Sequence, residues 1–470
     1  MKSEGTSQPG AAAPATRRRV SLWLAGGGVL AAGGALAAWH EATGFAPDRA
    51  ALWAAVGMGG VYLALLFVRP GRVGRGPLTA MFVLAVLIRL PWFAVPPSEG
   101  RDYWRFFWDG AVTAHGVSPY RHSPRAALEG RVREPSVARL AERHRPALER
   151  IGHPHLRTIY PPVAQGAFAL SYWIAPFNLT AWRVVLLAFD GLAALAVVGL
   201  LRRTGLPLSL AFVYLWNPLL GPETYLGGHM DVLAAAAVAC LAWALVAKRP
   251  VVAAVALAAG VGVKLWPVLL LPFVVRAAWS RRRQLVPSLA VLAVLLGGLA
   301  AAFAPAIGER ADSGLLAYAE TWRSRPGAYR AFAALGEWLR DEALPEASEH
   351  AVGRLLMLLV LLPAAGWLGL AGPRDPPALC RRMGLVILLM LLLAPVIWPW
   401  YYVALLPLAA GARLRLGLLT WTALLPLVYV QPPLTAAWVL LVVHAPVWLI
   451  LAGEWAWPRV LAPGREADHA

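Results

Sequence analysis

Long apolar runs, separated by short polar segments rich in arginine, follow one another along the whole chain. The first three cover about residues 20–39, 50–68 and 77–95, and similar runs recur towards the C-terminus. About 20 apolar residues in a helix cross a hydrocarbon layer of about 30 Å, and backbone polar groups in lipid must be satisfied within the segment. The pattern therefore predicts an all-α, polytopic membrane protein with about 11–13 helical membrane segments.

Basic residues at the ends of these runs set the predicted orientation. Arg17 to Arg19 precede the first run, and Arg69, Arg72 and Arg75 follow the second. Because basic residues are retained in the cytoplasm, we expect an uncleaved signal-anchor helix with a cytoplasmic N-terminus. Long external loops are then expected over residues 96–160 and 306–350.

The predicted organisation is one polytopic domain over residues 17–455, between a disordered cytoplasmic tail at 1–16 and a cytoplasmic tail at 456–470. Two runs, near 162–178 and 183–201, do not fit the predicted orientation. If both crossed the membrane, the chain would return to the outside, and the arginines that follow would lie there and not in the cytoplasm. One of these two runs is therefore expected not to cross fully.

A lysine and a proline interrupt the apolar stretch over about residues 251–277. Lys264 and Pro267 divide it into two short pieces. We expect broken or re-entrant helices there, which are tolerated where protein or a water-filled cavity covers the exposed backbone.

Composition agrees with a membrane protein and limits its partners. Hydrophobic residues make up 59% of the 470 residues and charged residues 14%, against about 25% charged in soluble domains. The net charge of +18 comes from basic residues at the ends of runs, as topology requires, so membrane lipids and not nucleic acid are the expected partners. Cys240 and Cys380 imply no disulfide framework.

The most informative polar segment is 101–110, just beyond the third run. As a helix it gathers Arg101, Asp102, Arg105 and Asp109 within about 100° of arc, and five aromatic side chains fill the rest of the circle. We interpret it as an interfacial helix whose aromatic face lies among lipid headgroups. Its charged residues are either the solvated face of an anchor or a site with a general base and phosphate contacts, which is the preferred interpretation.

The segment 217–231 is a polar, glycine-rich break between apolar pieces, and it carries Glu223, His229 and Asp231. Ionisable groups at membrane level indicate function by default. Asp231 also suits the N-cap of the following helix. His229 and Asp231 could belong to a divalent-metal site, although two ligands at this spacing are a weak signal.

Three further residues extend the candidate site. Lys264 is the only lysine of a long apolar stretch, so its amine either snorkels or meets an anion, and anion contact is preferred. Trp400 and Tyr401 lie between short apolar pieces, where they form an aromatic belt or stack on a sugar ring or isoprenoid chain. A solvated helix is expected over about residues 136–150, between two proline turns.

Taken in order, these segments resemble the bacterial polyprenyl-phosphate-mannose-dependent mannosyltransferases of the GT-C glycosyltransferase superfamily. The resemblance covers roughly residues 77–410 and rests on seven stretches in order: 102–110 (DYWRFFWDG), 116–120 (GVSPY), 158–162 (TIYPP), 217–231 (NPLLGPETYLGGHMD), 264–267 (KLWP), 314–318 (GLLAY) with Trp322, and 400–401 (WY). This order is more specific to the superfamily than to the sugar.

The resemblance implies transfer of a sugar, mannose by this likeness, from a polyprenyl-phosphate donor to a glycan or lipid-linked acceptor. It places the active site on the external face of the bacterial inner (cytoplasmic) membrane and implies an inverting displacement. Asp102 is the implied catalytic base, and Asp109 is the second candidate. The expected substrate-binding residues are Arg105, Tyr160, Glu223, His229, Asp231, Lys264, Trp400 and Tyr401.

Two departures from the family pattern affect these expectations. The family often has paired acids where this chain has Arg101 and Asp102, which removes one candidate base or metal ligand. Ser118 stands where the family has the asparagine of Asn-Pro-Tyr. No cofactor is therefore certain, and a divalent metal ion is an open expectation.

The alternative function is a transporter or flippase for a lipid-linked or anionic substrate, which would also use broken helices and charges at membrane level. Many transporter folds show internal repeats, and none is visible in this sequence. The gathering of acids in one external loop also favours an enzyme.

Overall fold

The computed structural model describes residues 14–44, 48–98, 101–307, 312–320, 322, 328–343, 349–372, 375–412, 416–429 and 436–456. Every regular element of these residues is a helix, and seven helices are long and apolar enough to cross a membrane. The all-α, polytopic fold class is thereby confirmed, while the count of 11–13 segments stays a prediction. Nearly all of the expected tails at 1–16 and 456–470 lies outside the described residues.

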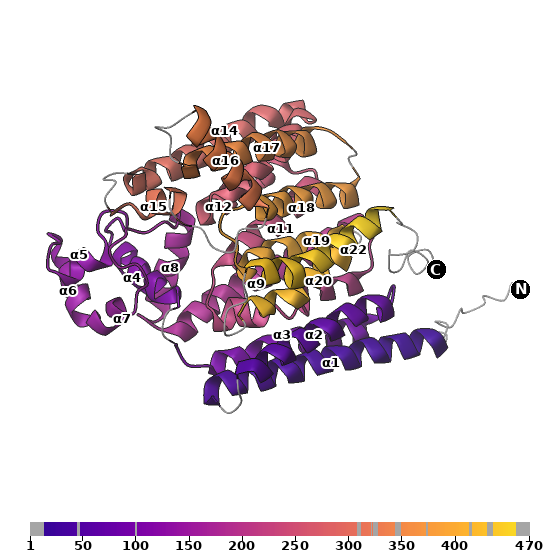
Figure 1. The fold of residues 1–470 in the computed structure, drawn as a ribbon. Helices are drawn as coiled ribbons and strands as arrows, with labels where there is room; N and C mark the ends of the chain where they lie inside the picture. The colour runs from indigo at the N-terminus through magenta and orange to yellow at the C-terminus, as the bar shows by residue number, and fades with distance from the viewer. Residues whose placement is uncertain are drawn as a thin grey trace, which may run out of the picture.

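Three N-terminal helices lie side by side along one flank of the molecule (Figure 1). They are α1 (Pro14–Thr43), α2 (Asp48–Val68) and α3 (Arg75–Arg89), the last continued by the 3-10 turn η1 (Leu90–Ala94). The Trp23 ring of α1 lies 4.7 Å from that of Trp216, so aromatic packing joins this flank to the central helices.

Four short helices occupy the long loop after η1 and gather at one end of the molecule (Figure 1). They are α4 (Tyr103–Ala114), α5 (Pro124–Leu128), α6 (Pro135–Arg143) and α7 (Arg145–Glu149). The single helix expected over 136–150 is wrong, because the chain breaks between α6 and α7 at His144. Pro146 lacks the N–H that a continuous helix would need and clashes with the preceding turn.

The two runs near 162–178 and 183–201, which do not fit the predicted orientation, form helices of very different length. The 13 residues of α8 (Pro162–Ile174) rise only about 20 Å, too little to cross the hydrocarbon layer. The 26 residues of α9 (Leu179–Thr204) are long enough. The two lengths agree with the prediction that one of the two runs does not cross fully, which stays a prediction.

The expected broken segment is also confirmed. The helix α11 (Asp231–Val246) is followed by α12 (Pro250–Val263), the 3-10 turn η4 (Trp266–Leu270) and α13 (Leu271–Trp279). Lys264 has extended backbone between α12 and η4, as expected for a residue near a proline that cannot continue a helix.

Shorter turns lead into this segment, and paired helices follow it. The turns are η2 (Leu208–Ala211), α10 (Phe212–Leu215) and the π-helical turn η3 (Gly221–Leu226). The later elements are α14 (Arg282–Phe303), η5 (Ala304–Ile307), α15 (Gly314–Glu320), α16 (Tyr329–Ala343), α17 (Glu349–Leu370), α18 (Pro376–Leu393), η7 (Pro399–Leu405), α19 (Leu406–Gly411), α20 (Leu416–Leu424), η8 (Leu425–Tyr429), α21 (Ala436–Val439), η9 (Leu440–His444) and α22 (Ala445–Ala456).

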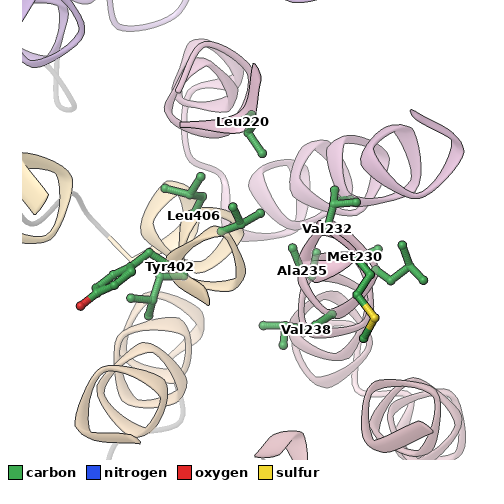
Figure 2. Close-up of a cluster of buried hydrophobic side chains, with 14 of the residues drawn as sticks. Leu220, Met230, Val232, Ala235, Val238, Tyr402 and Leu406 are labelled. Carbon is green, nitrogen blue, oxygen red and sulfur yellow. The ribbon is translucent and has the colours of Figure 1, made fainter. Parts of the chain in front are cut away.

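The centre of the molecule is a dense apolar core around α11. Figure 2 shows Val232, Ala235 and Val238 of α11 near Tyr402 and Leu406 of the η7–α19 segment, all of them buried. This packing fixes the N-terminal end of α11, where the polar residues of the candidate site begin.

A buried ion pair ties the N-terminal flank to this core. Arg89 Nε lies 2.5 Å from Asp190 Oδ2 on α9, and the hydroxyls of Tyr214 and Tyr225 donate to the same carboxylate at 2.7 and 2.6 Å. Because buried charges are tolerated when paired and hydrogen-bonded, this network makes the flank an integral part of the fold.

Candidate active site

The helix α4 packs into the protein and not onto the membrane surface. Its five aromatic residues are each 6% exposed or less: Tyr103, Trp104, Phe106, Phe107 and Trp108. The Phe106 ring stacks on Phe168 of α8 at 4.5 Å. The expected aromatic face among lipid headgroups is therefore wrong, because the short α8 and the start of α9 offer an apolar surface that covers it.

The two candidate acids of α4 lie in opposite environments. Asp102 precedes the first residue of the helix, and its side chain is exposed. Asp109 is 2% exposed and lies 3.2 Å from Arg105 Nε. A carboxylate that must exchange a proton with a substrate needs access, which only Asp102 has before any substrate binds.

Asp109 belongs to a buried polar cluster. Burial raises the pKa of its carboxyl above the ordinary value, against the opposing effects of Arg105 and of hydrogen bonds with Thr158 and Gln165. Arg105 also donates to the Leu156 carbonyl at 2.6 Å. These contacts fasten α4 to the end of the loop, which is a structural role.

A glycine brings α4 against the polar break that follows α10. Gly228 has φ +67°, and a Cβ there would lie 2.8 Å from the Tyr103 ring, so both the backbone conformation and the close approach require glycine. Trp182 Nε1 donates to the Gly228 carbonyl at 2.7 Å. The start of α4 is thus held beside the residues that begin α11.

Asp231 and Lys264 form an ion pair where α11 begins and α12 ends. Lys264 Nζ lies 2.6 Å from Asp231 Oδ1 and 4.0 Å from the centre of the Tyr401 ring. The expectation that Asp231 is the N-cap is wrong, because Asp231 is the first helical residue and Met230 holds the N-cap position. The Asp102 and Asp231 carboxylates repel each other, and the Tyr103 ring contacts Gly228, so α4 lies beside the ends of α11 and α12.

His229 links this ion pair to Glu223. Its Nδ1 lies 2.8 Å from the Glu223 carbonyl and 3.3 Å from Glu223 Oε2, and its ring stacks on Trp400 at 3.6 Å. Glu223 lies in the π-helical turn η3, a backbone form that is frequent at functional sites.

Tyr160 joins the cluster from the end of the long loop. Its ring packs edge to face on Phe106 of α4 at 5.1 Å, and its carbonyl accepts a hydrogen bond from Tyr120 at 2.8 Å. This hydrogen bond joins the two proline turns that bracket the loop, at residues 116–120 and 158–162, and holds them together.

Direct contacts link six of the residues that the sequence indicated into one chain, which runs from Glu223 through His229, Trp400, Tyr401 and Lys264 to Asp231. Further residues extend this group. Tyr429 donates to both Glu223 oxygens at 3.1 Å, and Tyr318 interacts electrostatically with Asp231. Gly314 approaches the Arg157 carbonyl so closely that a Cβ would overlap it. The family-like stretch 314–318 signalled Tyr318, whereas no local pattern marks Tyr429, which lies 206 residues from its partner.

A metal site is not apparent in the part of the chain that the structure describes, which holds no group of three His, Cys, Asp or Glu side chains in ligand geometry. His229 is engaged by Glu223, and Asp231 is engaged by Lys264. A divalent ion therefore stays an untested expectation.

An exposed carboxylate, a partly buried ammonium and aromatic rings lie where several apolar helices end, so the fold and this polar cluster define the class of polytopic membrane proteins with a polar site at the helix ends. The comparison with protein families makes the class specific. Residues 20–280, more than half of the chain, match the model of the MptA/B family, described as alpha-(1->6)-mannopyranosyltransferase, N-terminal domain. The chain belongs to this family and is a GT-C-type mannosyltransferase. No curated protein and no solved structure matches it.

Proposed function

We propose that the protein transfers mannose from polyprenyl-phosphate mannose to a glycan or lipid-linked acceptor on the external face of the bacterial inner membrane, with inversion at the anomeric carbon. One observation carries the proposal. The exposed Asp102 begins α4, whose Tyr103 packs against Gly228, and three residues further on the Asp231 carboxylate holds the ammonium of Lys264 at 2.6 Å. A proton acceptor and a cation for the departing phosphate thus belong to one cluster.

In the proposed reaction the acceptor hydroxyl oxygen attacks the anomeric carbon from the face opposite the phosphate. The new glycosidic bond forms as the bond between the anomeric carbon and the phosphate oxygen breaks. Asp102 takes the hydroxyl proton, and the polyprenyl phosphate leaves with the electron pair. Atoms and charge balance without a further reactant.

Lys264 is the proposed stabiliser of the departing phosphate. Its ammonium is held between Asp231 and the Tyr401 ring, so it is positioned before the donor arrives. Preorganised cations contribute most where negative charge develops in the transition state. His229 is the second proposed donor to the phosphate.

Other site residues take positioning roles in this proposal. Trp400 stacks on both His229 and Trp398, so we assign it to holding the His229 ring. Arg105 is engaged by Asp109 and by the Leu156 carbonyl, so we assign it to fixing α4. Glu223 accepts from Tyr429 and orients His229, and Tyr160 closes the site beside Asp102.

The proposed external position of the active site and the proposed lipid donor are consistent with each other. The basic flanks Arg17 to Arg19 and Arg69 to Arg75 favour a cytoplasmic position for their own segments and thus an external long loop. Nucleotide sugars are not available outside the cell membrane, so an external enzyme needs a lipid-carried sugar.

The test is transfer of labelled mannose in membranes that contain this chain. Purified polyprenyl-phosphate mannose should give a labelled glycan or lipid-linked product, and GDP-mannose should give none when synthesis of the lipid donor is blocked. NMR of the product should show the anomeric configuration opposite to that of the donor. Transfer from GDP-mannose alone would contradict the lipid donor, and a retained configuration would contradict single displacement.

Membership of a mannosyltransferase family argues against the transporter or flippase alternative. The same membranes provide a check. Movement of intact polyprenyl-phosphate mannose across the bilayer without formation of a new glycosidic bond would restore that alternative.

A further inference from the structure

A second charged site lies at the opposite end of α11 and α12 from Asp231 and Lys264. A cavity of about 650 Å³ opens there between the ends of α9, α11, α12, α13, α17 and α18. The 16 residues of α11 rise about 24 Å, so the cavity is well separated from the candidate active site.

The lining of this cavity has a basic part and an apolar part. Its basic side chains are Arg203, Lys248, Arg276, Arg281 and Arg382. Its apolar side chains include Leu245, Val246, Phe273, Ala277 and Leu379. A ligand that fits both parts carries negative charge at one end and hydrocarbon at the other.

Two of the five basic residues have a structural task. Arg382 Nε donates to the Leu368 carbonyl at 2.7 Å, and Arg276 donates to the Ala371 and Gly372 carbonyls at 2.7 and 2.8 Å. They satisfy backbone carbonyls at the end of α17. Arg276 and Arg382 also repel each other, so this end of the bundle has unfavourable like-charge contacts.

The other three basic residues form the rim of the cavity. Arg203, Lys248 and Arg281 have exposed side chains, and within the described ranges no ion pair joins them to a carboxylate. Asp375 is the acid that acts on Arg382. Because five cations around one hollow repel one another, an anion bound among them would stabilise the protein.

Lys248 lies at the rim of the cavity, directly after the end of α11. Its φ is +56°, the left-handed conformation that commonly ends a helix and that glycine usually adopts. The N–H groups of Lys248 and Arg249 donate to the Leu245 and Ala244 carbonyls at 3.0 and 2.8 Å. This cap fixes the backbone that carries Lys248 beside the cavity.

We propose that this cavity binds an anionic phospholipid, with the headgroup phosphate at Arg203, Lys248 and Arg281 and an acyl chain along Phe273 and Leu379. Basic pockets between membrane helices on the cytoplasmic side recognise such headgroups. The basic clusters of this end place it in the cytoplasmic leaflet, where anionic lipids are abundant. The apolar wall distinguishes a lipid from free phosphate.

The test is the thermal stability and lipid binding of the purified full chain in neutral detergent. Phosphatidylglycerol or cardiolipin should raise the Tm, whereas phosphatidylcholine and inorganic phosphate should not. In the triple variant R203Q/K248Q/R281Q the affinity for phosphatidylglycerol should fall by about a hundredfold, since each cation near a lipid headgroup contributes roughly a factor of five. The matched control R202Q/R282Q/R283Q removes the same charge from exposed neighbours outside the lining and should bind normally.

Each contrary result overturns the proposal. Equal losses in the two triple variants would mean diffuse surface charge, and equal protection by inorganic phosphate would mean a site for a soluble anion. Lys248→Gly removes the steric cost of the left-handed backbone conformation and should raise the Tm of the lipid-free protein, while the affinity for lipid falls. An unchanged affinity would show that Lys248 does not belong to the site. Mannose transfer is not part of this readout, so the outcome is independent of the proposed function.

Discussion

Lys264 and Asp231 are 33 residues apart in the chain and 2.6 Å apart in space. The contact joins the end of one helix to the start of its neighbour, and it gives the lone lysine of an apolar stretch a partner. The sequence predicts that Lys264 contacts an anion and does not only snorkel. In the structure this anion is the Asp231 carboxylate, and the donor phosphate is the second anion that we propose.

Replacing Lys264 by Met should weaken donor binding or turnover by at least about tenfold, roughly 1.4 kcal/mol, the scale of a lost charge-assisted contact. Kinetics with labelled polyprenyl-phosphate mannose measures this loss. The single variant leaves Asp231 buried without its cation, so the double variant K264M/D231N is the control for insertion and folding. Normal kinetics in a well-expressed K264M protein would show that Lys264 is structural.

Replacing Asp102 by Asn should reduce transfer by about 10²- to 10⁴-fold, the usual contribution of a general base, because the amide cannot accept the acceptor proton. Expression, Tm and donor binding should persist, since Asp102 is exposed.

Asp109→Asn is the matched control on the same helix. Its carboxylate is buried beside Arg105, so this variant should lose stability, seen as a lower Tm, more than it loses chemistry. A folded but inactive D109N protein together with an active D102N protein would assign the base to Asp109. Activity in both would move the search for the base to Glu223 or Asp231.

The topology has a direct chemical test. A cysteine placed at the exposed Arg139 of α6 should react with an impermeant thiol reagent in intact cells, and one at the exposed Arg72 should not. Cys240 and Cys380 are first replaced by alanine to remove background. Labelling at position 139 only after lysis would put the long loop in the cytoplasm and remove the argument for a lipid donor.

Acid should loosen the long loop through His144. Its ring stacks on Phe177 at 3.9 Å, and burial, followed by the nearby Arg143, lowers its pKa below the ordinary 6.5. Because the unfolded loop binds a proton more readily, the stacking contribution is complete above pH 6.5 and is lost as the pH falls towards the folded-state pKa. Protection factors of the loop amides, which correct for the pH dependence of intrinsic exchange, should be lower at about pH 5 than at pH 8 in the native protein. His144→Phe keeps the stack and should abolish the difference; a persisting difference would implicate another group.

The sequence predicted the positions of the helices better than the contacts that surround them. Apolar runs and basic flanks located α1, α2 and α3 within a few residues, because length and charge at membrane ends are local properties. The break at Lys264 and Pro267 was predictable for the same reason.

The environment of a helix depends on contacts with residues that are distant from it in the chain. The periodicity of α4 describes an amphipathic helix equally well whether lipid or protein covers its aromatic face, and only the position of α8 decides this. The difference between Asp102 and Asp109 likewise depends on Leu156 and Thr158, which no spacing rule connects to α4. Local patterns therefore marked both carboxylates as candidates without ranking their exposure.

The antiparallel packing of α11 and α12 has an electrostatic consequence for catalysis. Asp231 begins α11 and Lys264 follows the last residue of α12. The carboxylate thus lies at the positive end of one helix macrodipole and the ammonium at the negative end of another, each worth about 0.3–1 kcal/mol. In the proposed reaction Lys264 contacts the donor phosphate while it remains beside Asp231, and both charges keep part of their compensation from the backbone. The two helix ends thus act as a fixed counter-charge that lowers the cost of placing a second anion beside Lys264.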